Sequence, residues 1–184
     1  NKKQALFRAT VKRVNEIGFA ASSVSKIANE ANVSPSTLYV FFDNKEDLLV
    51  STYMEIKKEM ARFVLADFDD TLPIRDIVRN LWFSFFEFIS DNIENYDYCE
   101  QFAMSPYSGL VDQAVIEKEF APFINVFMAG IEQKIIKDVN IQILGAFMFS
   151  PLTRLANPRL YPGLEMDETN MEQAFTMMWD ALKL

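Results

Sequence analysis

The sequence predicts an all-α fold in which three short N-terminal helices precede a bundle of longer helices. Apolar residues recur at helical spacing along nearly all of the 184 residues, and no segment alternates as a half-buried strand would. Residues that commonly cap helices precede most of these apolar runs. The segment 73–93 is apolar on almost every side, so it is expected at the centre of the bundle.

The first two helices are predicted from apolar spacing and from the residues that flank it. The first helix is expected over 2–17, and Gly18 follows it as a typical helix stop. The second is expected over 24–31, where apolar residues lie three and four positions apart. Ser22 or Ser23 can cap it.

A tight turn over 32–34 separates the second predicted helix from a short third one over 35–41 or 35–42. Ser34 is the expected cap of the third helix, and the proline that follows it has the backbone angle of a first helical residue. Asn44 can cap a longer fourth helix that starts at Lys45.

The remaining chain predicts further helices of a bundle. Asn140 and Asp167 are expected caps, Pro122 should kink or break the helix that contains it, and 157–166 is expected to be a loop. These helices are expected over 73–93, 95–104, 110–137, 141–155 and 168–184.

The charge is distributed unevenly along the chain. The net charge is −8, but residues 1–50 carry seven Lys/Arg against five Asp/Glu, whereas residues 51–184 carry eleven against twenty-one. Residues 1–50, called the head below, are thus slightly basic, whereas the rest of the chain is acidic. This distribution is compatible with nucleic-acid binding at the N-terminal end only.

The composition argues against an enzyme, a metal site and a bound cofactor. The chain has no histidine, which removes the commonest general base and the commonest zinc ligand. Without histidine, neither the serines nor the single cysteine, Cys99, can have a histidine partner for nucleophilic catalysis. The glycines are not spaced for a nucleotide-binding loop. Glu87 and Asp91 lie one turn apart, a spacing that is common on solvated helix faces.

The expected location is the cytoplasm. A lone cysteine fits a reducing compartment, because it cannot form a disulfide within the chain. No apolar run is long enough for a membrane span, and no signal peptide opens the sequence.

The second and third predicted helices have the spacing of a helix-turn-helix. The small Ala28 suits the point where the third helix crosses the second, and Val33 and Leu38 can fill the core between them. The exposed face of the third helix then carries hydroxyl groups and one ring edge, which can meet bases and phosphates. These side chains belong to Ser36, Thr37 and Tyr39.

Residues 18–49 have the sequence GFAASSVSKIANEANVSPSTLYVFFDNKEDLL. This string resembles the signature of TetR-family (tetracycline-repressor-like) transcriptional regulators. The resemblance implies a homodimer whose recognition helices enter successive major grooves of a palindromic operator. It also implies a C-terminal domain in which a small ligand alters the separation of those helices, so the expected function is that of a ligand-responsive repressor.

The resemblance also implies which residues contact DNA. At the turn, on the third helix and at the start of the fourth, the matching positions are Ser34, Ser36, Thr37, Tyr39 and Lys45. Ser23 and Lys26, at the start of the second helix, are further candidates.

The chain departs from the family pattern at four positions. Asn32 replaces a turn glycine, which is tolerable because Asn accepts a left-handed conformation. Val40 stands where the family often has His or Lys, and Phe41 stands where it often has Tyr, so polar contacts are lost; Asp43 stands where a basic residue is frequent. Modest non-specific DNA affinity is therefore expected, with partial compensation from Lys2, Lys3, Arg8, Lys12 and Arg13.

The C-terminal part is rich in aromatic residues, with 17 Phe in the whole chain. These rings can form a plain core, or some of them can line a cavity for a small apolar or amphipathic effector. Neutral acyl compounds and lipophilic cations beside Glu87, Asp91 or Glu100 both remain open. The expected lining residues are Trp82, Phe86, Phe102, Met104, Tyr107, Phe123 and Phe127.

The last two predicted helices each carry an apolar stripe and are expected to form the dimer interface as a four-helix bundle. The predicted domains are 1–47 for DNA binding and 48–184 for ligand binding and dimerisation. The alternative is a helical carrier of lipids or other hydrophobic ligands that does not bind DNA, and residues 1–50 argue against it.

Overall fold

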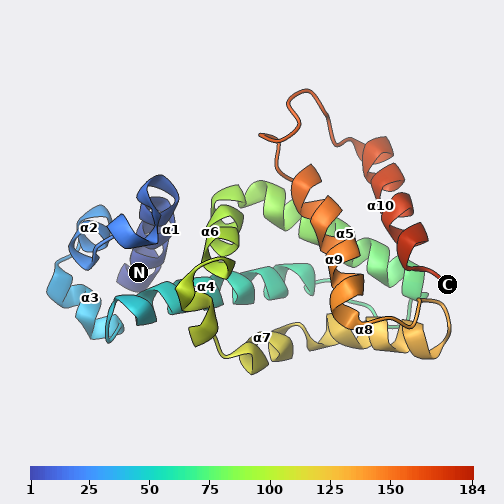
Figure 1. Ribbon diagram of the computed structural model, residues 1–184, viewed down its shortest axis with the longest axis horizontal. Helices are drawn as coiled ribbons and strands as arrows, with labels where there is room; N and C mark the ends of the chain where they lie inside the picture. Colours follow the sequence, from blue (N-terminus) through green and yellow to red (C-terminus); the bar gives the residue numbers. More distant parts are fainter. The chain divides into compact units, whose positions relative to one another are not determined.

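The computed structural model describes all residues from Asn1 to Leu184, and its regular elements are all helices, joined by turns and loops that contain one isolated bridge (Figure 1). The predicted all-α class is confirmed. No helix is both long enough and apolar enough to cross a membrane. The helices are α1 (Lys2–Ala21), α2 (Val24–Glu30), α3 (Pro35–Phe41), α4 (Lys45–Val64), α5 (Ile74–Asp91), α6 (Ile93–Ala103), the 3₁₀ helix η1 (Pro106–Leu110), α7 (Gln113–Glu119), α8 (Ala121–Glu132), α9 (Ile141–Leu155) and α10 (Glu168–Leu182).

Five of the predicted helix caps are confirmed. In each, the side-chain oxygen accepts a hydrogen bond of 2.8–3.3 Å from a backbone N–H in the first turn. Such a bond satisfies one of the N–H groups that a helix start leaves without a partner. These caps are Ser23, Ser34, Asn44, Asn140 and Asp167.

Two predicted helices differ in extent from the observed ones. Gly18 leaves the helical conformation at φ 77° and ψ 168°, as a stop would, but the chain resumes one further helical turn and α1 ends at Ala21. The continuous helix predicted over 110–137 is wrong, since the chain forms η1, α7 and α8 there, but the break expected at Pro122 is present at Phe120, between α7 and α8. Pro122 lies in the first turn of α8, where its missing N–H costs nothing.

The chain forms two compact units. The first contains residues Asn1–Glu59 and Asn92–Ile116, and the second contains Met60–Asp91 and Glu117–Leu184. Compactness therefore groups α6 and η1 with the N-terminal helices. The predicted boundary between residues 47 and 48 separates a DNA-binding part from a part for ligand binding and dimerisation. This functional division stays a prediction.

The second unit is built around α5, as its all-round apolar character predicts. This helix packs against α8, α9 and α10 (Figure 1). Trp82 is fully buried, and its indole N–H donates to the carbonyl oxygen of Met148 at 3.2 Å. Arg79 of α5 is ion-paired with Glu172 of α10 and lies 4.3 Å over the ring of Phe83. The unit thus combines a bulky aromatic core with specific polar ties between its helices.

Candidate nucleic-acid interface and cavities

The turn between α2 and α3 fixes the position of α3 on the head. Asn32 has φ 53°, the left-handed conformation that a glycine would otherwise supply. The N–H of Val33 donates to the carbonyl oxygen of Ala28 at 2.9 Å, which closes the turn. Ala28 and Leu38 are fully buried and pack in one cluster, so α3 is held against α2 along its inner side.

Three hydroxyl groups meet at the start of α3. The hydroxyl of Ser34 lies 2.7 Å from that of Ser36 and 3.0 Å from that of Thr37, and it also accepts the N–H of Thr37. Ser34 and Ser36 are exposed, and Thr37 is half-buried. A hydroxyl can make more than one hydrogen bond, so these groups keep capacity for a ligand outside the protein.

The outer side of α3 is uncharged. Tyr39 is 55% exposed and Val40 is 77% exposed, whereas Leu38 between Thr37 and Tyr39 faces the core. The helix contributes hydroxyl, methyl and aromatic groups to solvent, and no acidic or basic side chain.

Lys45 lies at the first position of α4 and is half-buried. Its ammonium group donates to the carbonyl oxygen of Phe19 at 2.6 Å. An ammonium has three donors, so this bond orients the side chain and leaves donors for an anion. The carboxylate of Asp47 accepts the backbone N–H of Asp43 at 2.9 Å, which orders the loop that precedes α4.

Other basic groups of the head are largely engaged by the head itself. Lys12 is paired with Glu30 at 2.5 Å, and this hydrogen bond lowers the pKa of the Glu30 carboxyl. Arg13 is paired with Glu16 at 2.8 Å. Lys26 donates to the carbonyl oxygen of Ala21 at 3.1 Å and remains exposed beside the Ser23 cap.

Phe19 connects this surface with an aromatic cluster that the sequence pattern did not predict. Its ring centroid lies 5.6 Å from those of Tyr98 and Tyr107 and 6.0 Å from that of Phe102. The buried hydroxyl of Tyr98 donates to the carbonyl oxygen of Leu49 at 2.8 Å, and burial raises the pKa of this phenol. The signal available in the sequence was only the helical spacing of the rings, which did not say what they face.

The predicted effector residues are distributed over both units. Phe102 is fully buried and half-buried Tyr107 packs nearby in the first unit, whereas Met104 is 90% exposed. In the second unit, the rings of Phe123 and Phe127 pack at 4.9 Å, Trp82 is buried and Phe86 is half-buried. The structure therefore does not bring these seven residues into one cavity, and their role in binding stays a prediction.

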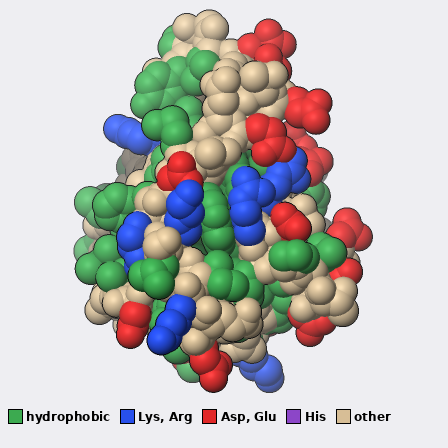
Figure 2. All heavy atoms as spheres, turned by 90° about the vertical axis from the view of Figure 1, so that its right-hand side faces the viewer, with side chains coloured by type: hydrophobic (Ala, Val, Ile, Leu, Met, Phe, Trp, Pro, Cys, Tyr) green, Lys and Arg blue, Asp and Glu red, His purple; other side chains and the backbone are tan.

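A groove of about 500 Å³ lies between α9, α10 and the loop that joins them. Its lining is mostly apolar and includes Phe147, which is 58% exposed, and Met177, which is 76% exposed. Figure 2 views the molecule from the side that carries α10 in Figure 1, and exposed hydrophobic side chains gather there in several groups.

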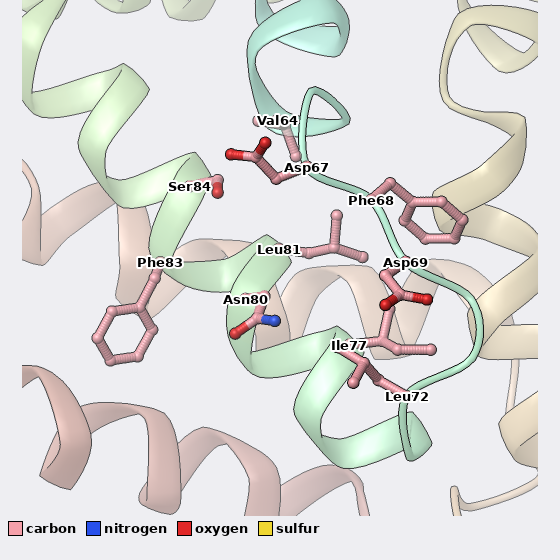
Figure 3. Close-up of a pocket in the computed structure, with 10 residues that line it drawn as sticks. All are labelled: Val64, Asp67, Phe68, Asp69, Leu72, Ile77, Asn80, Leu81, Phe83 and Ser84. Atoms are coloured by element: carbon pink, nitrogen blue, oxygen red, sulfur yellow. The ribbon is translucent and has the colours of Figure 1, made fainter.

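A smaller cavity of about 270 Å³ lies between α5 and the segment that joins α4 to α5 (Figure 3). Leu81 and Ile77 supply apolar lining, while Asp67 and Asp69 bring two carboxylates to its edge. Hydrogen bonds from Thr71 lower the pKa of the Asp69 carboxyl. A second cavity of about 530 Å³ adjoins α8 and also includes Phe68 and Ile77. No group of His, Cys, Asp and Glu side chains here could hold a metal ion.

Two family descriptions match most of the chain. Residues 3–52 match "Bacterial regulatory proteins, tetR family", and residues 73–183 match "Tetracyclin repressor-like, C-terminal domain". The first match covers the helix-turn-helix described above, and the second covers the helices from α5 to α10, η1 included.

Individual relatives agree with these matches. A TetR-family transcription regulator from Marinobacter aquaeolei has 33% identity and a TM-score of 0.91, over 99% of this chain and 95% of that one. A TetR-family protein from Vibrio parahaemolyticus shares the fold at 24% identity, with a TM-score of 0.83 over the full length of both chains. An uncharacterized HTH-type transcriptional regulator from Haemophilus influenzae is 30% identical over 89 residues, 48% of each chain. The matches thus span about half the length of the curated relatives.

Proposed function

The chain belongs to the TetR family of bacterial regulatory proteins, and we propose that it is a ligand-responsive repressor that binds a palindromic operator as a homodimer. Family membership makes it a transcriptional regulator and not an enzyme. The observation that carries the finer proposal is the outward face of α3, which the Asn32 turn and buried Leu38 hold in a fixed position.

The proposed DNA contacts divide into two chemical groups. Ser36, Thr37 and Tyr39 offer hydroxyls to base edges and phosphates from α3. Lys45 offers an ammonium at the start of a 20-residue helix, where the helix dipole and free N–H groups also favour a phosphate. Ser23 and Lys26 extend this set onto the start of α2.

The proposed dimer forms through α9 and α10. Their exposed apolar side chains, Phe147 and Met177 among them, would be removed from water when a second copy covers the groove. A two-fold dimer presents two copies of α3, and operator half-sites about 34–36 Å apart would accommodate them.

The proposed effector is a small apolar or amphipathic molecule held by the second unit. The two cavities beside α5 support this proposal, because both combine apolar lining with a few polar groups. Asp67 and Asp69 at the smaller cavity favour a ligand with a cationic or hydrogen-donating group. A hundredfold loss of operator affinity would require about 2.7 kcal/mol of coupling between effector and operator binding.

The proposed function is tested by selecting bound sites from random duplex DNA with the full chain, followed by titration of the selected site. We expect a palindrome bound by two copies, with an affinity that falls steeply as salt rises. Tyr39→Phe should weaken this binding, whereas Tyr107→Phe, the same change away from α3, should not. Failure to select any sequence would contradict the repressor, and the helical carrier of hydrophobic ligands would then become the better description.

A further inference from the structure

The recognition surface of α3 lacks the side chains that most often read guanine and adenine. Bidentate contacts to guanine come from Arg or Lys, and those to adenine come from Asn or Gln. Pro35–Phe41 contains none of these four residue types. The base-reading chemistry of α3 is therefore limited to hydroxyls, the Tyr39 ring and aliphatic methyl groups.

Val40 carries the methyl groups that stand furthest into solvent. It is 77% exposed, more than any other large hydrophobic side chain of α1 to α4. The core of the head does not need it, because Leu38 fills that core and is fully buried. Val40 follows Ser36 by four positions and Thr37 by three, so the three side chains are neighbours on the helix surface.

The neighbouring hydroxyls are weakly selective. Those of Ser36 and Thr37 already lie 2.7 Å and 3.0 Å from the hydroxyl of Ser34. A hydroxyl can donate or accept, so it suits several bases equally. The methyl groups of Val40, one helical turn after these hydroxyls, are therefore the group on this face that can discriminate between bases.

We propose that Val40 reads thymine, by packing its methyl groups on the C5-methyl of a thymine in each operator half-site. Thymine is the base that presents a methyl group in the major groove, so an exposed aliphatic side chain has one matching partner there. This inference rests on the proposed function, because it requires α3 to enter the major groove of a specific site. It assigns a specificity-determining role to a position at which the family pattern has other residues.

The test replaces each thymine of the selected palindrome by deoxyuridine, one symmetric pair at a time. Deoxyuridine removes the C5-methyl group and keeps the Watson–Crick pair and all hydrogen-bonding groups. At the thymine under Val40, we expect about a fourfold loss of affinity for each half-site, the factor for one buried methyl group. Substitution in both half-sites should then cost about sixteenfold, while other thymines respond little.

Two valine variants connect the effect with the side chain. In Val40→Ala, thymine and deoxyuridine at that position should bind within about twofold of each other, since both γ-methyl groups of the side chain are gone. Val139→Ala makes the same change at an exposed valine outside α3 and should retain the full thymine preference. Circular dichroism spectra, and the fraction of protein that binds DNA in a titration, establish that both variants are folded.

The outcomes distinguish the proposed repressor function from the proposed contact between Val40 and thymine. A selected palindrome with one sensitive thymine that Val40→Ala makes insensitive supports the inference. A selected palindrome in which no thymine responds, or in which Val40→Ala keeps the response, overturns the reading of thymine and leaves the repressor intact. If no palindrome is selected, the proposed function and this inference fail together.

Discussion

At the scale of single residues, Phe19 links a proposed phosphate contact to the interior of the first unit. Its carbonyl oxygen accepts the Lys45 ammonium at 2.6 Å, and its ring packs with Tyr98, Phe102 and Tyr107. The lysine is therefore held by the backbone of a residue that is itself fixed by three rings. Such a side chain loses less conformational freedom when it binds an anion than a fully mobile lysine would.

Lys45→Met should weaken binding to every DNA sequence by a similar factor. The change removes a cationic group and keeps most of the aliphatic side chain. We expect the slope of log affinity against log salt to fall by about 0.9 for each phosphate that the variant no longer neutralises. Lys137→Met is the matched control, because the Lys137 ammonium also donates to a backbone carbonyl, that of Ala181, but lies in the second unit. Equal slopes for Lys45→Met and the unmodified chain would argue against a phosphate contact.

Cys99 should react slowly with thiol reagents in the folded protein. Burial raises the pKa of its thiol from 9.0 to about 11, and the residue is only 4% exposed. At pH 8, roughly one thiol in a thousand would be ionised, and the thiolate is the reactive form. We expect modification by a chromogenic disulfide to be at least about a hundredfold slower in buffer than in urea.

The same shift in the pKa of Cys99 sets the sign of a pH effect on stability. The unfolded thiol loses its proton near pH 9.0, while the folded one keeps it until about pH 11. Between these values the unfolded state binds fewer protons, so the free energy of unfolding should decrease as pH rises. Urea titrations at several pH values measure this trend, and Cys99→Ala should make it shallower.

At the scale of helices, local chemistry sets most boundaries of this fold. Five side-chain caps begin helices, and two residues with positive φ, Gly18 and Asn32, redirect the chain in the head. Gly18 has φ 77° and ψ 168°, a region that is nearly restricted to glycine. The path of the chain from α1 into α2 therefore depends on this one position.

Gly18→Ala should lower the free energy of unfolding by about 1–3 kcal/mol, the usual cost of a side chain in such a conformation. A Cβ atom at Gly18 would meet nothing within 4 Å, so the cost would come from the backbone and not from a clash. Gly109→Ala is the matched control, because Gly109 also has open space around it and lacks a positive φ. Equal urea midpoints for the two variants would contradict the assignment of strain to Gly18.

At the scale of the whole molecule, each of the two compact units has its own core. The first buries clusters around Leu38 and around Tyr98, and the second surrounds α5 with α8, α9 and α10. The second unit also leaves an apolar groove between α9 and α10 open to solvent. A single chain gains nothing from this exposed surface, whereas a symmetric pair of chains would bury it.

Phe147→Asp should convert the proposed dimer into a monomer at micromolar concentration. The substitution places a carboxylate where Phe147 is now 58% exposed beside the groove, and burial of an unpaired charge in an interface typically costs several kcal/mol. Light scattering after size exclusion measures the mass, and specific operator binding should fall with it. Leu110→Asp, at a side chain that is also 58% exposed but lies in η1, should leave the mass unchanged. A dimeric Phe147→Asp variant would exclude the groove as the interface.

Sequence patterns predicted most of the helices, their caps, the turn at Asn32 and the outward face of α3, but not the division of 110–137 into η1, α7 and α8. These features depend on residues within a few positions of one another, such as Ser34 with Thr37 or Asn44 with Asp47. Helical spacing also identified α5 as the centre of its unit, because a helix that is apolar on all sides has no side left for solvent.

Which distant segments meet depends on the packing of whole helices, and the sequence pattern did not predict it. The hydroxyl of Tyr98 donates to the carbonyl oxygen of Leu49, which lies 49 positions earlier in the sequence. The ring of Phe102 stacks on that of Tyr53 at 4.4 Å, across a similar separation. Spacing along a helix says that such a ring faces inward, but not which helix it meets. For the same reason the sequence could not separate the core aromatics from the residues that line the cavities beside α5. Burial depends on the packing of whole helices, and the residues of one helix do not contain that information.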